Sequence, residues 1–156
     1  MTNILVTGAP RTGKTTLIST IITKLNVSVI GFITTEIREN KIRTGFTIET
    51  YSGIKKILAS KKNLESKYRV GRYGVYLDNL NFIVNKLEEE LNNEIPKLII
   101  IDEIGKMELF SRSFKDFVMK ALNQNKVLGT IMLMDNDFTK TIKLRSDTKI
   151  FEINLQ

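Results

Sequence analysis

One segment near the start of the chain has the composition and spacing of a phosphate-binding loop. Residues 8–15 match the Walker A pattern G-x-x-x-x-G-K-[S/T] at every fixed position. An apolar run ends at the first glycine and a helical pattern begins near the lysine, which is the context that separates a genuine loop from a chance match. The segment comprises Gly8, Ala9, Pro10, Arg11, Thr12, Gly13, Lys14 and Thr15.

The residue types in this segment predict how it would bind a triphosphate. Glycines allow backbone N–H groups to point inward around a phosphate, at a helix N-terminus whose dipole favours anions. Lys14 is then expected to reach the β- and γ-phosphates, and the hydroxyl of Thr15 to bind Mg²⁺. We therefore predict a nucleotide site with Mg²⁺ as its cofactor.

A second segment supplies carboxylates. Residues 98–101 are apolar, as in a buried strand, and Asp102 and Glu103 follow directly. Because ligands of open α/β sheets bind at the carboxyl ends of the strands, this pair should lie beside the phosphates. Asp102 is predicted to be the magnesium-side carboxylate, acting through water, and Glu103 to be the general base that polarises an attacking water. Glu103 and Lys14 are the candidate catalytic residues.

The adjacency of the two acidic residues bears on the reaction and on the strand order. A bound water with a carboxylate beside it favours hydrolysis. The adjacent Asp-Glu pair is similar to that of the RecA-like branch of P-loop ATPases, and unlike the small GTPases. That branch usually places another strand between the two strands that carry the motifs. We expect the same order here.

The composition excludes several other kinds of chemistry. The chain of 156 residues contains no cysteine and no histidine. Thiol nucleophiles, disulfides, zinc sites built on those residues and Ser-His-Asp triads are therefore excluded. The length is typical of one domain, so we predict that residues 1–156 form a single domain.

The charge favours an anionic partner. The chain has 24 basic and 17 acidic residues, a formal net charge of +7, which suits nucleic acid, phosphorylated ligands or anionic membrane surfaces. Most basic residues are lysines scattered over predicted surfaces, which favours a polyanionic small ligand over a nucleic-acid groove. No apolar stretch is long enough to cross a membrane and no leader pattern is present, so we expect a cytoplasmic protein without a membrane partner.

Hydrophobic periodicity predicts elements that alternate along the chain. Helical spacing is found over 14–25, 76–91, 113–123 and 137–144, and Ser111 or Ser113 is expected to cap the third of these helices. Strands are predicted over 3–7, 27–37, 43–50, 54–59, 97–103, 127–134 and 149–153. Residues 60–75 are interpreted as an irregular basic loop, either a solvated connection or a flap over the phosphates.

This alternation predicts an α/β fold. Connections too long for hairpins favour a mostly parallel sheet between two layers of helices, a three-layer architecture of the P-loop NTPase type. The strands within 27–59, which include a hairpin turn at 39–41, are the departure from this pattern. We expect them to extend one edge of the sheet in antiparallel fashion.

The stretch from Asp102 onward resembles the signature of a known family. It comprises Asp102, Glu103, Ile104, Gly105, Lys106, Met107, Glu108, Leu109, Phe110 and Ser111. The stretch looks like the signature of the small nucleoside-triphosphatase family known from thermophiles and from a human cancer-related member. Segments 31–38, 43–46, 52–53, 70–73 and 128–131 resemble the family in the same order, so the resemblance covers nearly the full length.

The resemblance implies an activity and a set of site residues. It implies Mg-dependent hydrolysis of nucleoside 5′-triphosphates (ATP, GTP, CTP and UTP) to diphosphate and phosphate, with broad base tolerance and slow turnover. It also implies that residues 8–15 bind the nucleotide together with a second stretch. That stretch comprises Ile99, Ile100, Ile101, Asp102, Glu103, Ile104, Gly105 and Lys106.

The chain departs from the family at two places. A glycine is usual where Arg11 stands, so either the loop is less free or Arg11 adds a phosphate contact. Residues 60–69 look unlike other members, and nothing transfers to them.

Several charged residues have roles that the sequence leaves open. Lys106 either reaches the γ-phosphate or holds the loop after the strand. Glu36, Arg38 and Arg43 lie on the predicted hairpin, where cross-strand pairing is favoured over lining a cleft. The candidates for an arginine that neutralises transition-state charge are Arg69, Arg72, Arg112 and Arg145.

Two alternatives to a hydrolase stay open. A nucleotide or small-molecule kinase would use the same loop, with Glu103 deprotonating an acceptor hydroxyl and residues 60–75 as a lid. A nucleic-acid-associated switch ATPase would use slow hydrolysis to time an interaction. The physiological substrate, the base-binding residues and the oligomeric state do not follow from the sequence.

Overall fold

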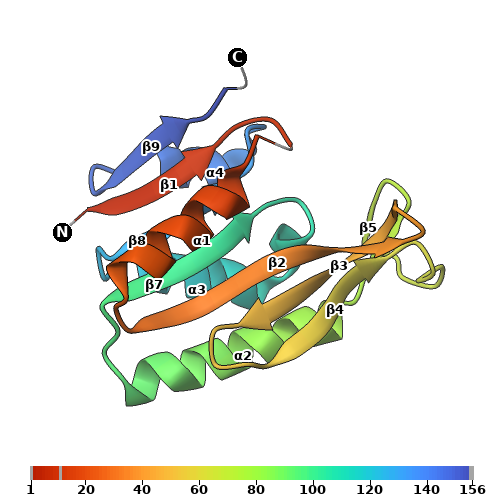
Figure 1. Cartoon of the computed structure of the whole chain (residues 1–156), viewed down its shortest axis with the longest axis horizontal. Helices are drawn as coiled ribbons and strands as arrows, with labels where there is room; N and C mark the ends of the chain where they lie inside the picture. The colour runs from red at the N-terminus through yellow and green to blue at the C-terminus, as the bar shows by residue number, and fades with distance from the viewer. Residues whose placement is uncertain (1, 11, 155–156) are drawn as a thin grey trace.

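Figure 1 shows the computed structural model of the chain, which describes residues 2–10 and 12–154. The strands are β1 (Asn3–Thr7), β2 (Val29–Glu39), β3 (Ile42–Thr50), β4 (Lys55–Ser60), β5 (Arg69–Val70), β6 (Tyr73–Val75), β7 (Leu98–Ile104), β8 (Val127–Ile131) and β9 (Thr148–Glu152). The helices are α1 (Lys14–Leu25), α2 (Leu77–Asn93), α3 (Arg112–Leu122) and α4 (Asp137–Lys143), with a 3₁₀ turn η1 (Glu108–Phe110).

The described strands form one mixed sheet in the order β5-β6-β4-β3-β2-β7-β8-β1-β9. Strands β2, β7, β8, β1 and β9 are parallel to one another. Strands β3, β4, β6 and β5 continue the sheet in antiparallel fashion from β2. The predicted edge extension is therefore confirmed, and so is the predicted order of the motif strands, because β8 lies between β1 and β7.

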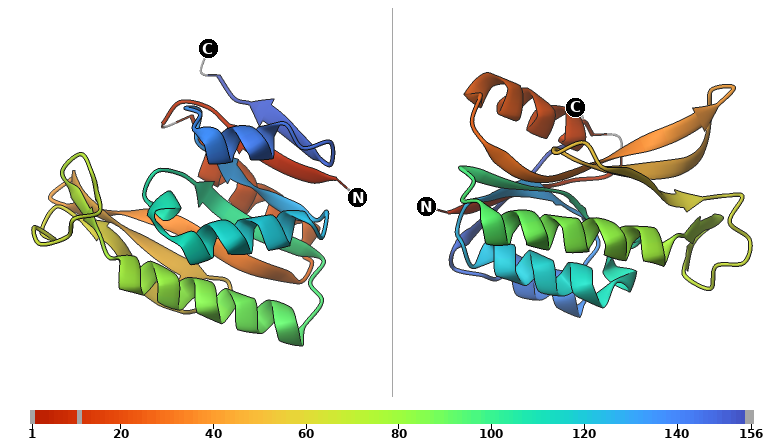
Figure 2. Two further views of the ribbon diagram at one scale, coloured as in Figure 1. Left: turned by 180° about the vertical axis from the view of Figure 1, so that it is seen from behind. Right: turned by 90° about the horizontal axis from the view of Figure 1, so that it is seen from below.

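Helices cover both faces of the parallel part (Figure 2). The right-hand view shows α1 alone on one face and α2 and α3 on the other, and the left-hand view shows α4 on the same side as α3. The pleat of β7 divides its apolar residues between the two layers. Ile100 packs with Val6 and Ile18 under α1, whereas Ile99 and Ile101 belong to the larger core under α2 and α3.

The distal parts of β2 and β3 project from the body of the sheet (Figure 1). We call this projection, residues 34–47, the arm. Its tip is a two-residue turn in which Asn40 and Lys41 both have positive φ, 51° and 68°. Such a turn matches the twist of the strands it joins. Strands β2 and β3 pair from Phe32 opposite Thr50 to Glu39 opposite Ile42, with one register shift between Ile37 and Arg38.

The segment 60–75 is the main correction to the predicted elements. It is not an irregular loop throughout, because β5 and β6 form a small hairpin that pairs with β4. The Arg69 guanidinium holds this hairpin by donating to the backbone carbonyls of Asn63 (2.7 Å) and Arg72 (2.9 Å). Strands of two and three residues are too short to produce a detectable period, so the sequence pattern missed them.

Other differences are smaller. Strand β8 ends at Ile131, so residues 132–134, predicted as strand, form the connection to α4. The 3₁₀ turn η1 was not predicted. Ser111 caps α3 by accepting the N–H of Phe114 at 3.0 Å, which confirms one of the two predicted caps. Among the described residues no helix combines the length and apolarity needed to cross a bilayer.

Candidate functional site

The phosphate-binding loop connects the carboxyl end of β1 to the start of α1. At Gly8 the chain passes so close to the segment after β9 that an added Cβ would lie 2.6 Å from the carbonyl oxygen of Ile153. Gly13 precedes α1 in a left-handed conformation, and no side chain caps the helix. The first N–H groups of α1 therefore face the loop without a side-chain partner, as an anion site requires.

Lys14 lies across the mouth of this loop. Its ammonium donates to the carbonyl of Gly8 at 2.8 Å and lies 3.4 Å from Oε2 of Glu103. The Lys14 side chain is only 11% exposed, against 34% for Glu103. The contact joins the two motifs, which lie far apart in the sequence, into one site.

Asp102 is a buried carboxylate with one oxygen held and one oxygen free of partners. It is 1% exposed. Its Oδ1 accepts from Thr130 at 2.6 Å and lies 3.4 Å from the hydroxyl of Thr15, whereas Oδ2 has no hydrogen-bond partner among the described residues. Burial raises the pKa of Asp102, and the hydrogen bonds from Thr130 and Thr15 oppose that rise. An unpartnered buried carboxylate oxygen beside a hydroxyl suits a hard cation.

A second buried carboxylate lies close to Glu103. Glu108, in η1, is 4% exposed, and burial followed by the charge of Glu103 raises its pKa well above the usual range. Gly105 lies between the two: an added Cβ would be 2.8 Å from Oε1 of Glu103 and 3.1 Å from Oε1 of Glu108. A side chain at position 105 would therefore meet both carboxyl groups.

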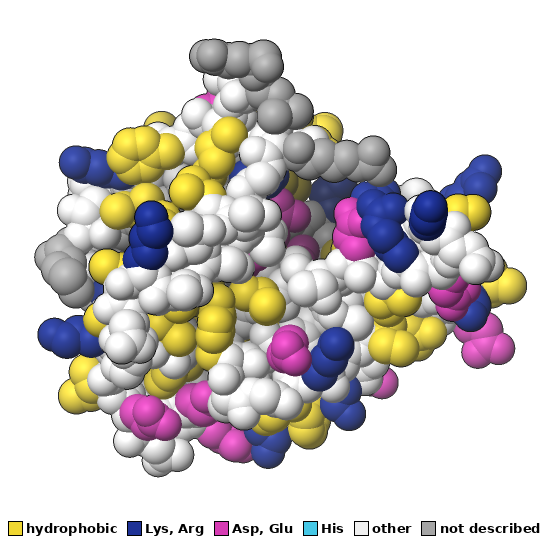
Figure 3. Space-filling view, viewed as in Figure 1, with side chains coloured by type: hydrophobic (Ala, Val, Ile, Leu, Met, Phe, Trp, Pro, Cys, Tyr) yellow, Lys and Arg dark blue, Asp and Glu magenta, His cyan; other side chains and the backbone are white. Residues whose placement is uncertain are grey.

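The site opens into a cavity of about 670 Å³ between the phosphate-binding loop and the arm. Figure 3 shows it as the hollow between α1 and the arm, with acidic side chains in its depth and basic side chains at its edge. From the predicted site it is lined by Gly8, Ala9, Pro10, Lys14, Thr15, Asp102, Glu103 and Lys106.

Some predicted site residues do not line the cavity. Ile99, Ile100, Ile101 and Ile104 have no exposed surface. They form the buried core of β7 and position the carboxylates beside them, and a direct contact of these four residues with nucleotide stays a prediction. Gly13, Thr12 and Gly105 flank the cavity, and the Thr12 hydroxyl donates to the carbonyl of Ala9 at 2.8 Å. Arg11 lies outside the described residues.

The arm contributes Arg43, for which the sequence favoured cross-strand pairing over lining the cleft. Arg43 lines the cavity and also lies 3.7 Å from Glu36, so cross-strand pairing and cleft lining, treated as alternatives, occur together. Its guanidinium carbon lies 5.1 Å from the ring centroid of Phe46 and 5.4 Å from that of Tyr73. Its Nε–H donates to the hydroxyl of Tyr73 at 2.9 Å.

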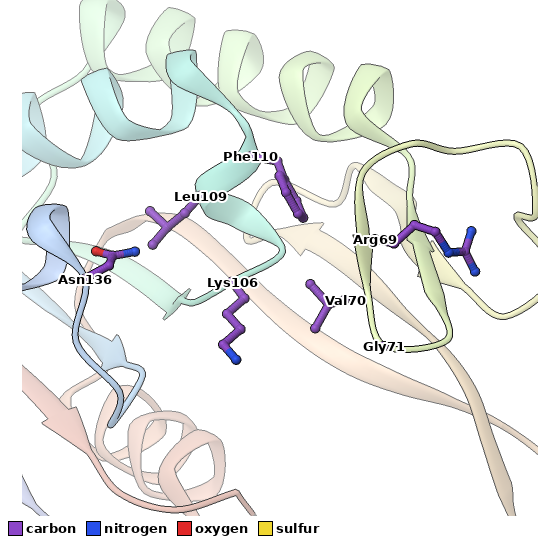
Figure 4. A pocket seen from close by; sticks show the side chains of 7 residues that line it. All are labelled: Arg69, Val70, Gly71, Lys106, Leu109, Phe110 and Asn136. Carbon is purple, nitrogen blue, oxygen red and sulfur yellow. The ribbon is translucent and has the colours of Figure 1, made fainter.

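The four arginines proposed to neutralise transition-state charge lie elsewhere. Arg145 pairs with Asp147 at 2.8 Å, and neither Arg72 nor Arg112 lines the cavity. Arg69 contributes to a neighbouring cavity of about 430 Å³. Figure 4 shows that its guanidinium points away from the other labelled side chains, and it donates to the carbonyls of Asn63 and Arg72.

Two functional candidates escaped sequence reasoning. Thr130 stands in an apolar strand and carries no motif of its own, and Glu108 belongs to the family-like stretch without an assigned role. For Thr130, the available signal was a hydroxyl within the otherwise apolar run 127–131.

Comparison with known proteins gives consistent matches along the whole chain. A family model described as NTPase matches residues 3–156. Nucleoside-triphosphatase THEP1 of Thermotoga maritima is 46% identical over 153 residues, covering 97% of this chain and 86% of the relative. The corresponding protein of Aquifex aeolicus is 45% identical over 140 residues, covering 85% and 78%.

Solved structures agree with the sequence matches. The crystal structure of THEP1 from the hyperthermophile Aquifex aeolicus aligns with a TM-score of 0.83 at 39% identity, covering 98% of this chain and 90% of that chain. The solution structure of a human cancer-related nucleoside triphosphatase aligns with a TM-score of 0.79 at 33% identity, covering 99% and 89%.

Proposed function

The chain belongs to the THEP1 nucleoside-triphosphatase family, and from that premise we propose that it hydrolyses nucleoside 5′-triphosphates to diphosphate and phosphate with the help of Mg²⁺. One observation carries the proposal: Lys14, Thr15, Asp102 and Glu103 line a single cavity at the N-terminus of α1.

Thr15 and Asp102 are the proposed magnesium ligands. The fit rests on the unpartnered Oδ2 of Asp102 and the hydroxyl of Thr15 beside its Oδ1. No group of three or more acidic side chains that could hold a metal is present among the described residues. Such sparse protein ligation suits Mg²⁺, which in nucleotide sites takes most other ligands from phosphates and water. When bound, the ion would neutralise part of the negative charge of the triphosphate.

Lys14 is proposed to bind the terminal phosphates. In the described conformation its ammonium is held by Gly8 and Glu103. Phosphate oxygens carry more negative charge than a carbonyl and attract the ammonium more strongly. Transfer of Lys14 to the phosphates then frees the Glu103 carboxylate to accept a hydrogen bond from water.

Glu103 is proposed to act as the general base. It accepts a proton from a water molecule whose oxygen attacks the γ-phosphorus, and the bond from that phosphorus to the bridging β–γ oxygen breaks. The nucleoside diphosphate leaves and inorganic phosphate forms. The 34% exposure of the Glu103 side chain allows water to reach it.

Broad base tolerance and slow turnover are also proposed. The names of the relatives specify nucleoside triphosphates and no particular base, which supports use of ATP, GTP, CTP and UTP. Slow turnover rests on the family resemblance.

The test is phosphate release from each of the four triphosphates, with Mg²⁺ and with a chelator in its place. Glu103→Gln keeps the shape of the side chain but removes the base, so we expect retained nucleotide binding and a loss of turnover of about 100-fold or more. Glu89→Gln, on the exposed face of α2, is the matched control. Normal turnover by Glu103→Gln would refute the assignment of the base, and normal turnover in chelator would refute the role of Mg²⁺.

A further inference from the structure

The cavity extends well past the residues that serve the triphosphate. In P-loop enzymes the metal-side carboxylate and the base mark the γ end of the nucleotide. Here both follow the buried part of β7, which lies on the arm side of β1 in the sheet order. The arm wall, which contributes Thr34, Thr35, Glu36, Arg43 and Phe46, therefore lies beyond the γ-phosphate position.

Arg43, on this wall, has a fixed orientation that suits an anion-binding group. Two rings flank its guanidinium, Tyr73 accepts a hydrogen bond from its Nε–H, and its Nη1 lies 3.7 Å from Glu36. Its Nη2 has no hydrogen-bond or ion-pair partner among the described residues, and the residue lines the cavity. The carboxylate of Glu36 lies 3.7 Å away and makes its closer ion pair with Arg38. A pre-oriented guanidinium with a weakly engaged counter-ion is suited to bind a phosphate.

The remaining lining suits a flat apolar group. Leu58, Val70 and Met107 line the same cavity. The neighbouring cavity of about 430 Å³ adds Leu109 and Phe110 (Figure 4).

Lys106 connects the two cavities. It lines both of them, and its ammonium makes no hydrogen bond or ion pair with the rest of the described chain. Figure 4 shows its side chain directed into the gap beside Val70. A second cation therefore stands between the γ-phosphate end and the arm.

We propose that the arm side of the cleft binds a nucleoside monophosphate, with its phosphate on Arg43 and Lys106, and that this molecule accepts the γ-phosphoryl group. The proposal rests on the proposed function, because it uses the same triphosphate site. A phosphate oxygen of the monophosphate attacks the γ-phosphorus, the bond to the bridging β–γ oxygen breaks, and two nucleoside diphosphates result. A dianionic phosphate oxygen carries no proton, so the transfer needs no base; water takes the place of the acceptor when none is bound.

The experiment incubates the protein with Mg²⁺ and ATP labelled at the γ-phosphate, with AMP, GMP, CMP or UMP or with the corresponding nucleosides. Chromatography separates labelled diphosphate and labelled monophosphate from released phosphate. We expect at least one monophosphate to become a labelled diphosphate, and no nucleoside to become a labelled monophosphate. Affinity for the accepted monophosphate is measured by titration calorimetry.

Arg43→Gln and Arg38→Gln form a matched pair on the arm. Both guanidiniums contact Glu36, but only that of Arg43 lines the cavity. Loss of a hydrogen bond to a charged group predicts a rise of about tenfold or more in the monophosphate KM for Arg43→Gln. Acceptor-free phosphate release should change less than about twofold in both variants. Arg38→Gln releases Glu36 toward Arg43, so it should raise the monophosphate KM by a smaller factor than Arg43→Gln does. Tyr73→Phe keeps both rings and removes only the hydroxyl that orients Arg43, so the monophosphate KM should rise less than in Arg43→Gln. This variant tests the site even if Arg43→Gln does not fold.

Three outcomes would overturn the proposal. One is phosphate release without labelled diphosphate and without heat of monophosphate binding. Another is equal phosphorylation of nucleosides, which would remove the need for an anion site. The third is an equal loss of acceptor-free hydrolysis in Arg43→Gln, which would assign Arg43 to the triphosphate. Absence of phosphate release from every triphosphate would instead refute the proposed function itself.

Discussion

The environment of the Asp102 carboxylate determines its charge and its orientation. Burial disfavours its charge, and the 2.6 Å hydrogen bond from Thr130 offsets that cost on one oxygen while the other stays unpartnered. Thr130 thereby fixes the orientation of the carboxylate. Thr130 would affect the ion only through Asp102, so we assign it as a positioning residue.

Removal of that hydrogen bond should be measurable in two ways. Thr130→Val keeps the shape and leaves a buried charged acceptor without its donor, so we expect a loss of about 1–3 kcal/mol in the free energy of unfolding. We also expect a higher Mg²⁺ concentration for half-maximal phosphate release. Urea unfolding and a Mg²⁺ titration measure the two effects.

Thr7→Val is the matched control for this prediction. Thr7 is buried at the end of the neighbouring strand β1, and its hydroxyl has no hydrogen-bond partner among the described residues. Its replacement should therefore be neutral or stabilising. Equal losses in the two variants would mean that the hydrogen bond to Asp102 contributes nothing.

At the scale of elements, the connection between β8 and α4 forms one wall of the cleft. Met132, Leu133 and Met134 line the cavity from this segment. Lys143, in the last turn of α4, folds back and donates to the carbonyls of Met132 (3.0 Å) and Leu133 (3.2 Å) and to Asp135 (2.6 Å). One ammonium thus contacts three groups of a connection that is neither helix nor strand.

We predict that Lys143→Met loosens this wall. The carbonyls lose a charged donor, so unfolding free energy should fall by about 1–2 kcal/mol and amide hydrogen exchange over residues 132–136 should accelerate. Lys140→Met, on the exposed face of the same helix, should leave both unchanged. Unchanged exchange in the Lys143 variant would show that the wall is held by other contacts.

At the scale of the whole molecule, the net charge of +7 is consistent with an anionic substrate. Of the basic residues, Lys14, Arg43 and Lys106 line the cleft. Several others are engaged in ion pairs on the surface, such as Lys120 with Glu88 at 3.0 Å and Lys62 with Glu39 at 2.9 Å. This distribution favours a small polyanion in the cleft over a continuous nucleic-acid groove.

We therefore expect phosphate release to be indifferent to added DNA or RNA. A nucleic-acid-dependent switch would show stimulated turnover, with an effect that falls steeply as salt rises. Turnover measured across a salt series with and without single- and double-stranded nucleic acid distinguishes the two. Salt-sensitive stimulation would restore the alternative of a nucleic-acid-associated ATPase.

The sequence by itself determined the features that depend on local spacing. The periodic elements were predicted within a few residues, because a helix or strand that buries one face must repeat its apolar residues. The two motifs were also predictable, since loop, lysine and carboxylates each require a particular residue type at the end of a strand. The strand between them was expected from the similarity to the RecA-like branch. The cytoplasmic location and the single domain stay predictions.

Only the tertiary structure decided which distant residues share the cleft. Arg43 and Tyr73 come from strands β3 and β6, and their contact depends on how the antiparallel strands pair, which leaves no mark on either segment. Thr130 reaches Asp102 because β8 lies beside β7. Cross-strand neighbours are set by sheet order and register, quantities that arise from the packing of the whole chain rather than from any local pattern.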